Sequence, residues 1–339
     1  MPLNNFRSPN VNNLTIVTLD YTTLKKRKYR TKQMNKNVAR ILKILVGIIL
    51  LILLIHFLGT NNILSTLLET AWYVIPLTIF SILFIAFLNA INFHLLAQAL
   101  GSKIKFKKTL KITLISWSAA RLVPGNLGDL SLIPLFKKED LSYGQGSALV
   151  IVDKIINLLV LLILSSYAFI ILVGLNNTIK IALLLLIPVA LFLILIINKR
   201  TKKTLRKFLP KFLKEYSQGF SKSINQLVLK SPIEILINFI LTFLKMASAA
   251  ILFWIMFKSY NLSVPFETII SIKALGSVAS YLPISPGGLG LKEGVIAFAY
   301  QQFSINPTIP SVVYLINRFF LFVLAFLFGF LALKEIKTN

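Results

Sequence analysis

Residues 280–293 read SYLPISPGGLGLKE, and residues 120–129 read ARLVPGNLGD. Both runs lie inside long apolar regions, 267–303 and 109–136, and both contain Pro-Gly, then Leu-Gly, then an acidic residue. Proline removes a backbone donor and glycine adopts dihedral angles that other residues avoid, so each run predicts a break in a helix. The two copies together predict an internal repeat built on broken helices.

The rest of the chain has the composition of a polytopic membrane protein. Of its 339 residues, 56% are hydrophobic and 14% are charged, whereas soluble domains carry roughly a quarter charged residues. This composition excludes an ordinary soluble enzyme and a disordered protein. The chain has no cysteine and only two histidines, His56 and His94, so thiol chemistry and a zinc site are not expected. We expect no metal, no cofactor and no catalytic residue.

Six stretches are long and apolar enough to cross a bilayer, which takes about 20 residues per helix. These stretches are 41–58, 71–97, 149–174, 179–197, 232–257 and 311–333. The two Pro-Gly regions are divided into short halves, so we expect each to enter and leave the membrane on one face. The predicted fold class is an all-α polytopic membrane protein with about six spanning helices and two Pro-Gly re-entrant hairpins in an inverted repeat.

Basic residues divide the connecting segments into two sets. Residues 1–40 carry nine Lys and Arg, residues 101–111 carry five and residues 198–231 carry ten, whereas 59–70 and 304–310 carry none. Basic loops favour the cytoplasmic side of a membrane. We therefore expect a multi-pass protein of the cell (plasma) membrane with both termini cytoplasmic. The net charge of +26 is interpreted mainly as this topology signal and not as a nucleic-acid interface.

The chain is expected to divide into two tails and a membrane domain. Residues 1–40 form a basic, disordered cytoplasmic tail, residues 41–333 form the membrane domain, and residues 334–339 form a second cytoplasmic tail. Within the domain, residues 198–231 carry apolar side chains at helical spacing between lysines and arginines. This pattern predicts a cytoplasmic amphipathic helix at the membrane interface, with a solvated linker as the alternative.

Three predicted spans separate the two Pro-Gly regions, and an odd number inverts their orientation. The first hairpin would enter from the cytoplasm and the second from outside. Inverted repeats with broken helices near the bilayer midplane are a recurrent plan of transporters.

The runs RLVPGNLGD at 121–129 and PGGLGLKE at 286–293 resemble the membrane region of lysylphosphatidylglycerol synthetase/flippase proteins and their stand-alone relatives. The resemblance covers about residues 40–333 and implies movement of an aminoacylated phospholipid across the bilayer. For stand-alone members it implies a link to lipid or polyprenol-glycan pathways.

Two features depart from this family. Family members often show Glu-Arg where this chain has Asp153-Lys154, which keeps the charges but loses the bidentate geometry of arginine. Two-part members carry a soluble aminoacyl-transferase domain after the spans, whereas this sequence ends six residues after Leu333. We therefore do not expect synthetase activity.

Ionisable residues at membrane depth are costly and mark functional sites. They are Arg121, Asp129, Asp153, Lys154, Lys245, Lys273, Lys292, Glu293 and Arg318. Six are basic and three are acidic, so a cavity that they share would suit an anionic lipid head group. The predicted substrate site comprises Arg121, Pro124, Gly125, Gly128, Asp129, Asp153, Lys154, Pro286, Gly287, Gly288, Gly290, Glu293 and Arg318.

Within this site we expect Arg121 and Arg318 to bind phosphate. The free backbone N–H groups of helices that begin after Gly128 and Gly290 would assist, because a helix N-terminus attracts anions. Asp153 would pair with a residue on another helix, Arg121 for instance.

Two interpretations of the acidic residues Asp129 and Glu293 remain open. Asp129 and Glu293 would pair with the basic residues in an empty site, or contact a cationic head group. The alternative is that each acid only caps its own helix. For the lysines, the alternative is that Lys245, Lys273 and Lys292 extend to the membrane interface.

The leading functional prediction is transbilayer movement, or flipping, of an anionic phospholipid, an aminoacylated phospholipid or a polyprenyl-linked lipid. The sequence lacks the Gly-rich phosphate loop of ATP-driven proteins. Two alternatives remain open: an intramembrane enzyme that acts on lipid-linked substrates, and a non-catalytic membrane partner of a separate aminoacyl- or glycosyltransferase. The expected partners are membrane lipids with an anionic head group and, in the last alternative, a separate transferase. No nucleic-acid partner is expected, and the oligomeric state is not predicted.

Overall fold

The computed structural model describes residues 42, 45–122, 127–197, 219–282 and 284–338. The chain divides into two units, residues 1–46 and 47–339. Nearly all of the first unit lies outside the described residues, including the predicted tail 1–40. The second unit contains the helices and the site discussed below.

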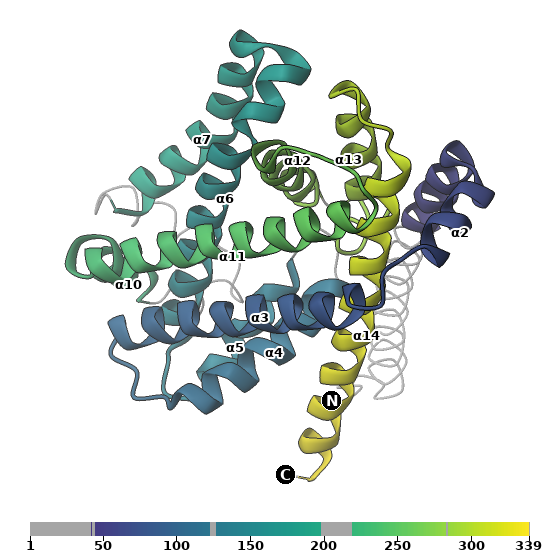
Figure 1. The fold of residues 1–339 in the computed structure, drawn as a ribbon. Coiled ribbons are helices and arrows are strands. Elements are labelled where there is room, and N and C mark those ends of the chain that lie inside the picture. Colours follow the sequence, from purple (N-terminus) through teal and green to yellow (C-terminus); the bar gives the residue numbers. More distant parts are fainter. Residues whose placement is uncertain (1–41, 43–44, 123–126, 198–218, 283, 339) are drawn as a thin grey trace, which may run out of the picture. The chain divides into compact units, whose positions relative to one another are not determined.

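The described part of the second unit is built from helices joined by short connections (Figure 1). The elements are α2 (Thr60–Leu68), α3 (Val74–Ala99), α4 (Phe106–Leu122), the 3₁₀ helix η1 (Leu127–Ser131), α5 (Leu132–Lys137), α6 (Tyr143–Val173), α7 (Leu175–Ile197), α10 (Phe220–Asn225), the π-helix η2 (Gln226–Lys230), α11 (Pro232–Ser259), α12 (Phe266–Ala279), α13 (Leu291–Gln302) and α14 (Thr308–Thr338). The all-α polytopic membrane fold predicted from the sequence is confirmed.

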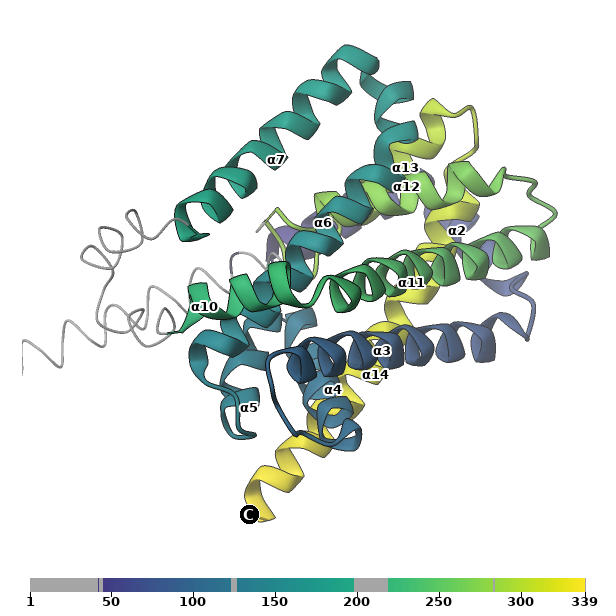
Figure 2. The same ribbon diagram turned by 90° about the vertical axis from the view of Figure 1, so that its left-hand side faces the viewer.

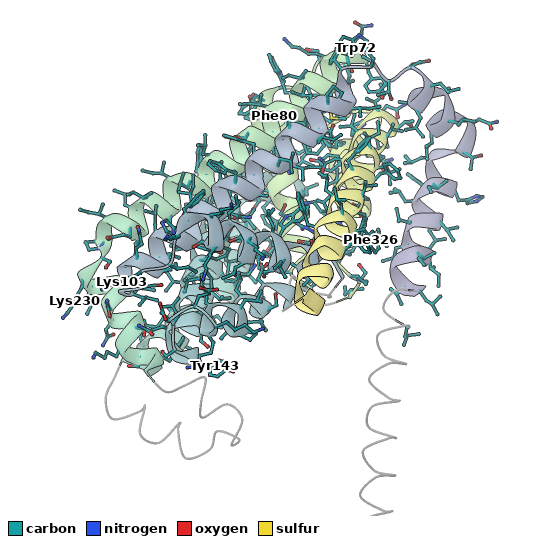
Figure 3. The ribbon with its side chains drawn as sticks, turned by 90° about the horizontal axis from the view of Figure 1, so that it is seen from below. Trp72, Phe80, Lys103, Tyr143, Lys230 and Phe326 are labelled. Carbon is teal, nitrogen blue, oxygen red and sulfur yellow. The ribbon has the colours of Figure 1, made fainter. Side chains whose placement is uncertain are left out.

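Within the described residues, four helices are long and apolar enough to cross a membrane. They are α3, α6, α11 and the Thr308–Phe330 part of α14, and they coincide with four of the six predicted spans. The other two predicted spans fall on shorter apolar helices, Leu45–Leu58 and Leu175–Leu191. Side chains on these helices leave large apolar surfaces exposed, among them Phe80 and Phe326 (Figure 3), as expected for helices that face lipid.

Helices distant in sequence pack along one another. Helix α3 lies beside α11, α12 packs against α6, and α14 packs against α4, as Figure 1 and Figure 2 show. Each of these pairs joins a segment from the first half of the chain to one from the second half. The arrangement brings the first Pro-Gly region, between α4 and α5, toward the second, between α12 and α13.

The connections of this unit gather at two opposite ends. At one end, Gln226 Nε2 donates to Ala99 O at 2.7 Å and Gln145 Nε2 donates to Leu100 O at 3.0 Å. At the other end, the hydroxyls of Thr70 and Tyr260 are 2.5 Å apart. Figure 3 shows Lys103, Lys230 and Tyr143 at one end and Trp72 at the opposite one. The connections that carry Lys103 and Lys230 therefore lie at the same end of the unit.

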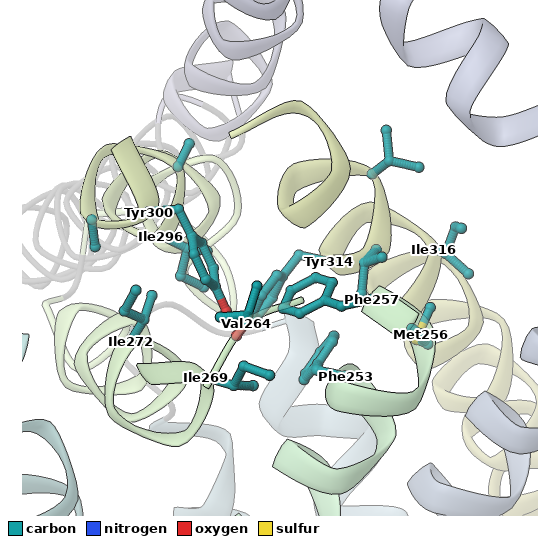
Figure 4. Close-up of a cluster of buried hydrophobic side chains, with 14 of the residues drawn as sticks. Phe253, Met256, Phe257, Val264, Ile269, Ile272, Ile296, Tyr300, Tyr314 and Ile316 are labelled. Atoms are coloured by element: carbon teal, nitrogen blue, oxygen red, sulfur yellow. The ribbon is translucent and has the colours of Figure 1, made fainter. Parts of the chain in front are cut away.

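The largest apolar core lies among α11, α12, α13 and α14 (Figure 4). The rings of Phe253 and Tyr314 stack with centroids 4.2 Å apart, and Phe257 meets Tyr300 edge-on at 5.6 Å. All four side chains are buried. This packing fixes α13 and α14 relative to each other, and these two helices carry Glu293 and Arg318.

Residues 198–218 of the predicted amphipathic segment lie outside the described residues, whereas α10 and η2 bury Ile224 and Leu227 in a core shared with α6. Helix α14 continues through Thr338, so the predicted C-terminal tail extends this helix.

Candidate functional site

A cavity of about 230 Å³ lies where α3, α4, α6, α11, α12, α13 and α14 converge. Its wall contains eight of the nine intramembrane ionisable residues: Arg121, Asp129, Lys154, Lys245, Lys273, Lys292, Glu293 and Arg318. The ninth, Asp153, is not in the wall. The remaining lining is apolar or carries amides and hydroxyls.

After the first Pro-Gly break, the described chain from Leu127 packs back against α4. A methyl group added at Gly128 would lie 2.1 Å from Ala120 Cα, so only glycine permits this close return. The return places Asp129 beside α4, in the cavity wall. Pro124 and Gly125 lie outside the described residues. The expected helix N-terminus after Gly128 is wrong, because the five-residue 3₁₀ helix η1 and the six-residue α5 follow instead.

The second Pro-Gly region forms a tight turn between α12 and α13. Gly290, with a φ of 76°, ends this turn, and its backbone N–H donates to Glu293 Oε2 at 2.9 Å. Glu293 therefore caps its own helix, but it also pairs with Arg318, so the alternative that it only caps this helix is wrong. This contact occupies one of the N–H groups that we expected to face a phosphate. Pro286, Gly287 and Gly288 are buried in the turn.

The two Pro-Gly regions meet at Gly287. A methyl group added there would lie 3.3 Å from the backbone oxygen of Arg121, the last residue but one of α4. The Arg318 Nη1 group donates to the Gly287 carbonyl at 2.8 Å. The turn between α12 and α13 therefore contacts the C-terminal end of α4, where the first break begins.

Arg318 is held by an ion pair with Glu293. Its Nε and Nη2 groups donate to Glu293 Oε1 at 2.8 and 2.5 Å. The two side chains are 10% and 2% exposed. Together with the bond to Gly287, these contacts engage all three guanidinium nitrogens of Arg318. Arg318, one of the two arginines expected to bind phosphate, thus already donates hydrogen bonds to the protein from each guanidinium nitrogen.

A second ion pair repeats this arrangement in the first half of the chain. The Lys154 ammonium donates to Asp129 Oδ2. Lys154 follows Asp129 by 25 residues, and Arg318 follows Glu293 by the same 25 residues. In both halves, an acid that follows the Pro-Gly break pairs with a base on the next long helix.

The expected pair between Asp153 and Arg121 is wrong. The buried Asp153 carboxylate accepts from Asn157 Nδ2 at 3.0 Å and from Asn238 Nδ2 at 3.4 Å. Consecutive residues on a helix point about 100° apart, and of these two only Lys154 belongs to the cavity wall. Lys154 takes the cavity side and Asp153 faces α11.

Four basic side chains in the wall have no carboxylate within ion-pair distance in the part of the chain that the structure describes. Lys245 donates to Asn89 Oδ1 at 2.6 Å and Lys292 donates to Ser277 Oγ at 3.1 Å. The Lys273 ammonium lies 4.9 Å from the centre of a phenylalanine ring. These contacts direct the three lysines toward the cavity and not toward a membrane interface.

Arg121 is the fourth of these basic side chains. Its guanidinium carbon lies 5.0 Å from the centre of the Trp117 ring. Its buried Nε has no hydrogen-bond partner among the described residues. Arg121 therefore has a buried donor that no described residue occupies.

Sequence reasoning missed several polar residues of the wall. Asn89, Asn157, Ser277 and Tyr281 line the cavity beside the charged residues. An amide inside an apolar span, such as Asn89 in α3, is a signal that could have identified them, because unpaired polar groups are costly there.

The wall offers an anion positive charge and N–H and O–H donors in an apolar frame. Six of its side chains are basic and two are acidic, a formal surplus of four positive charges. Across the described residues, no group of three His, Cys, Asp or Glu side chains is arranged to hold a metal ion.

Comparison with known proteins agrees with these observations. The chain is 22% identical over 106 residues to a UPF0104 membrane protein of Methanocaldococcus jannaschii, a stretch that is 31% of this chain and 32% of that protein. The match thus spans about a third of the length of this relative. The model of the family "Lysylphosphatidylglycerol synthase TM region" matches residues 40–329, nearly all of the membrane domain with both Pro-Gly regions. The chain therefore belongs to the lysylphosphatidylglycerol synthase transmembrane-region family.

Proposed function

We propose that this protein moves an anionic lipid across the bilayer of the cell membrane, with the lipid head group passing through the cavity at the Pro-Gly break. The observation that carries the proposal is the formal surplus of four positive charges in a wall shared by both Pro-Gly regions. A buried surplus of charge is costly unless a counter-charge neutralises it. The phosphate of a lipid head group that enters the cavity would supply this counter-charge.

The size of the cavity favours a head group over a whole lipid. Its volume of about 230 Å³ is below the roughly 300–1,000 Å³ of pockets that enclose drug-sized ligands. The acyl chains would stay outside, against apolar surfaces such as those of Phe80 and Phe326. A lipid would then move with its polar end inside the protein and its tails in the membrane.

The repeated ion pairs support a mechanism based on two related halves. In this mechanism the two Pro-Gly regions are re-entrant hairpins of an inverted repeat, and each opens the shared cavity toward one leaflet. The basic end of the unit would face the cytoplasm, following the distribution of lysine and arginine. Asp129–Lys154 and Glu293–Arg318 would hold the two hairpins while the unpaired basic residues bind phosphate.

The test is lipid transport by purified protein in liposomes. Fluorescent phosphatidylglycerol is placed in one leaflet, and its arrival in the other is followed by chemical quenching. We expect movement with the wild-type protein that protein-free liposomes lack. Arg121→Gln should lose most of this movement, because it removes from the wall a positive charge with a buried, unpartnered Nε donor.

The matched control is Lys230→Gln, which removes the charge of an exposed lysine at the end of η2. It should transport at the wild-type rate. Absence of protein-dependent movement of any anionic lipid would contradict the proposal, as would equal rates in Arg121→Gln and the wild type. Conversion of the lipid without movement would instead favour an intramembrane enzyme.

A further inference from the structure

We infer that the cavity selects head groups that carry two negative charges, such as a lipid phosphomonoester or diphosphate, over singly charged phosphodiesters and over aminoacylated head groups. The inference rests on the proposed function and narrows its substrate class. It depends on which charges of the wall are already neutralised inside the protein.

Both acids of the wall are already occupied. Asp129 accepts from Lys154, and Glu293 accepts from Arg318 and from the backbone N–H of Gly290. Within the described wall, no carboxylate is left to receive an ammonium group. A head group that carries lysine would bring its ammonium groups beside unpaired lysines and an arginine, where like charges repel.

The positive charge of the wall exceeds what one phosphodiester neutralises. After the two ion pairs are set aside, Arg121, Lys245, Lys273 and Lys292 remain without a carboxylate partner among the described residues. Asp153, behind the wall, offsets one charge at most. A monoanion would leave at least two positive charges uncompensated in a medium where charge interactions are strong. A dianion offsets more of the surplus and accepts more of the available N–H donors.

The four basic side chains come from four different helices. Arg121 lies on α4, Lys245 on α11, Lys273 on α12 and Lys292 on α13. They therefore surround the cavity and do not form a single stripe. Such an arrangement suits a compact group with oxygens on several sides, as in a phosphomonoester or a diphosphate.

Trp117 provides a native reporter for the test. It lines the cavity and lies under Arg121. The other tryptophans, Trp72 and Trp254, are outside the cavity wall. In the Trp72→Phe/Trp254→Phe protein, the fluorescence of Trp117 alone is titrated in nanodiscs at about pH 7.5. The probes are phosphatidic acid, phosphatidylglycerol and lysylphosphatidylglycerol with identical short acyl chains, and inorganic phosphate and pyrophosphate.

At this pH a phosphomonoester carries close to two negative charges. We expect phosphatidic acid to bind at least about tenfold more tightly than phosphatidylglycerol, and lysylphosphatidylglycerol to bind most weakly. Lys273→Met or Lys292→Met should reduce the preference for the dianion severalfold, whereas Lys230→Met should not. Equal affinities, a reversed order or no response to any probe would overturn the inference. Inorganic pyrophosphate that binds as tightly as the lipid would assign the site to a soluble anion instead.

The same lipids in the transport assay separate this inference from the proposed function. Transport of all anionic lipids without a preference in binding would refute the inference alone. A binding preference without transport of any lipid would refute the proposed function and leave an anion-binding membrane site.

Discussion

Arg318 lies 25 residues after Glu293 and donates two hydrogen bonds to the same carboxylate oxygen, at 2.8 and 2.5 Å. Lys154 likewise lies 25 residues after Asp129 and donates one hydrogen bond to its carboxylate. In each half of the chain, this pair ties the segment after a Pro-Gly break to the next long helix. The pairs thereby neutralise both acids of the cavity wall and leave other basic residues without a carboxylate partner among the described residues.

Breaking the buried pair should destabilise the protein. Glu293→Gln leaves Arg318 buried without its counter-charge and weakens the cap at Gly290, so we expect a loss of about 3–5 kcal/mol. Thermal unfolding in detergent measures this loss as a lowered Tm. Glu267→Gln is the control, because Glu267 is exposed in the first turn of α12. Equal Tm values for the two variants would show that the pair contributes little.

Removing the acid of the other pair should tighten anion binding. Asp129→Asn releases Lys154 and raises the surplus of positive charge in the wall by one. Both side chains are partly exposed, so the cost in stability should be only about 1 kcal/mol. The Trp117 titration should show severalfold tighter binding of phosphatidic acid. Weaker binding by a folded Asp129→Asn protein would mean that Asp129 contacts the ligand favourably.

The turn before α13 should tolerate only glycine at position 290. Gly290 has a φ of 76°, and an added methyl group would lie 2.5 Å from Leu50 Cβ and 2.7 Å from the Gly47 carbonyl oxygen. Gly290→Ala should therefore destabilise the protein by at least about 2 kcal/mol. Gly294→Ala on the same helix meets nothing within 4 Å and should be neutral or stabilising. Similar unfolding temperatures for the two variants would contradict this description of the turn.

Orientation in the membrane can be read from engineered cysteines, because the chain has none of its own. Asn61 in α2 and Lys107 in α4 are exposed residues. In intact cells, an impermeant thiol reagent should label Asn61→Cys and should label Lys107→Cys only after the membrane is opened. This result follows from the cytoplasmic placement of basic loops. The reverse labelling pattern would require the opposite orientation.

The sequence predicted the fold class because span length and hydropathy depend on local composition. It also indicated that ionisable residues of 109–136 and 267–303 belong to one site, since charges at membrane depth are costly and mark functional sites. The hydrogen-bond partners of Asp153 and Lys154 depended on which of the two side chains faces the cavity. Their adjacent positions in the sequence did not determine this. Lys154 faces Asp129, whereas Asp153 faces two asparagines.

The backbone after each break was the other feature that the sequence left undetermined. Pro-Gly-x-Leu-Gly appears in both regions, yet a twelve-residue helix follows Gly290 and only short 3₁₀ and α turns surround Gly128. Gly128 packs directly on Ala120 of the preceding helix α4, a contact that the motif alone does not encode. Similarly, Asn89 gains its place in the wall from the packing of α3 beside α11, which no local pattern encodes.

The most direct test of the central claim asks whether the cavity itself receives the head group from both sides of the membrane. Ser277 lines the cavity beside Lys292, and Ser277→Cys changes a single atom. In proteoliposomes of uniform orientation, a negatively charged impermeant thiol reagent is added to either side, with and without phosphatidic acid. We predict labelling from both sides that phosphatidic acid slows severalfold. Labelling from one side only, or a rate unaffected by the lipid, would contradict passage of the head group through this cavity.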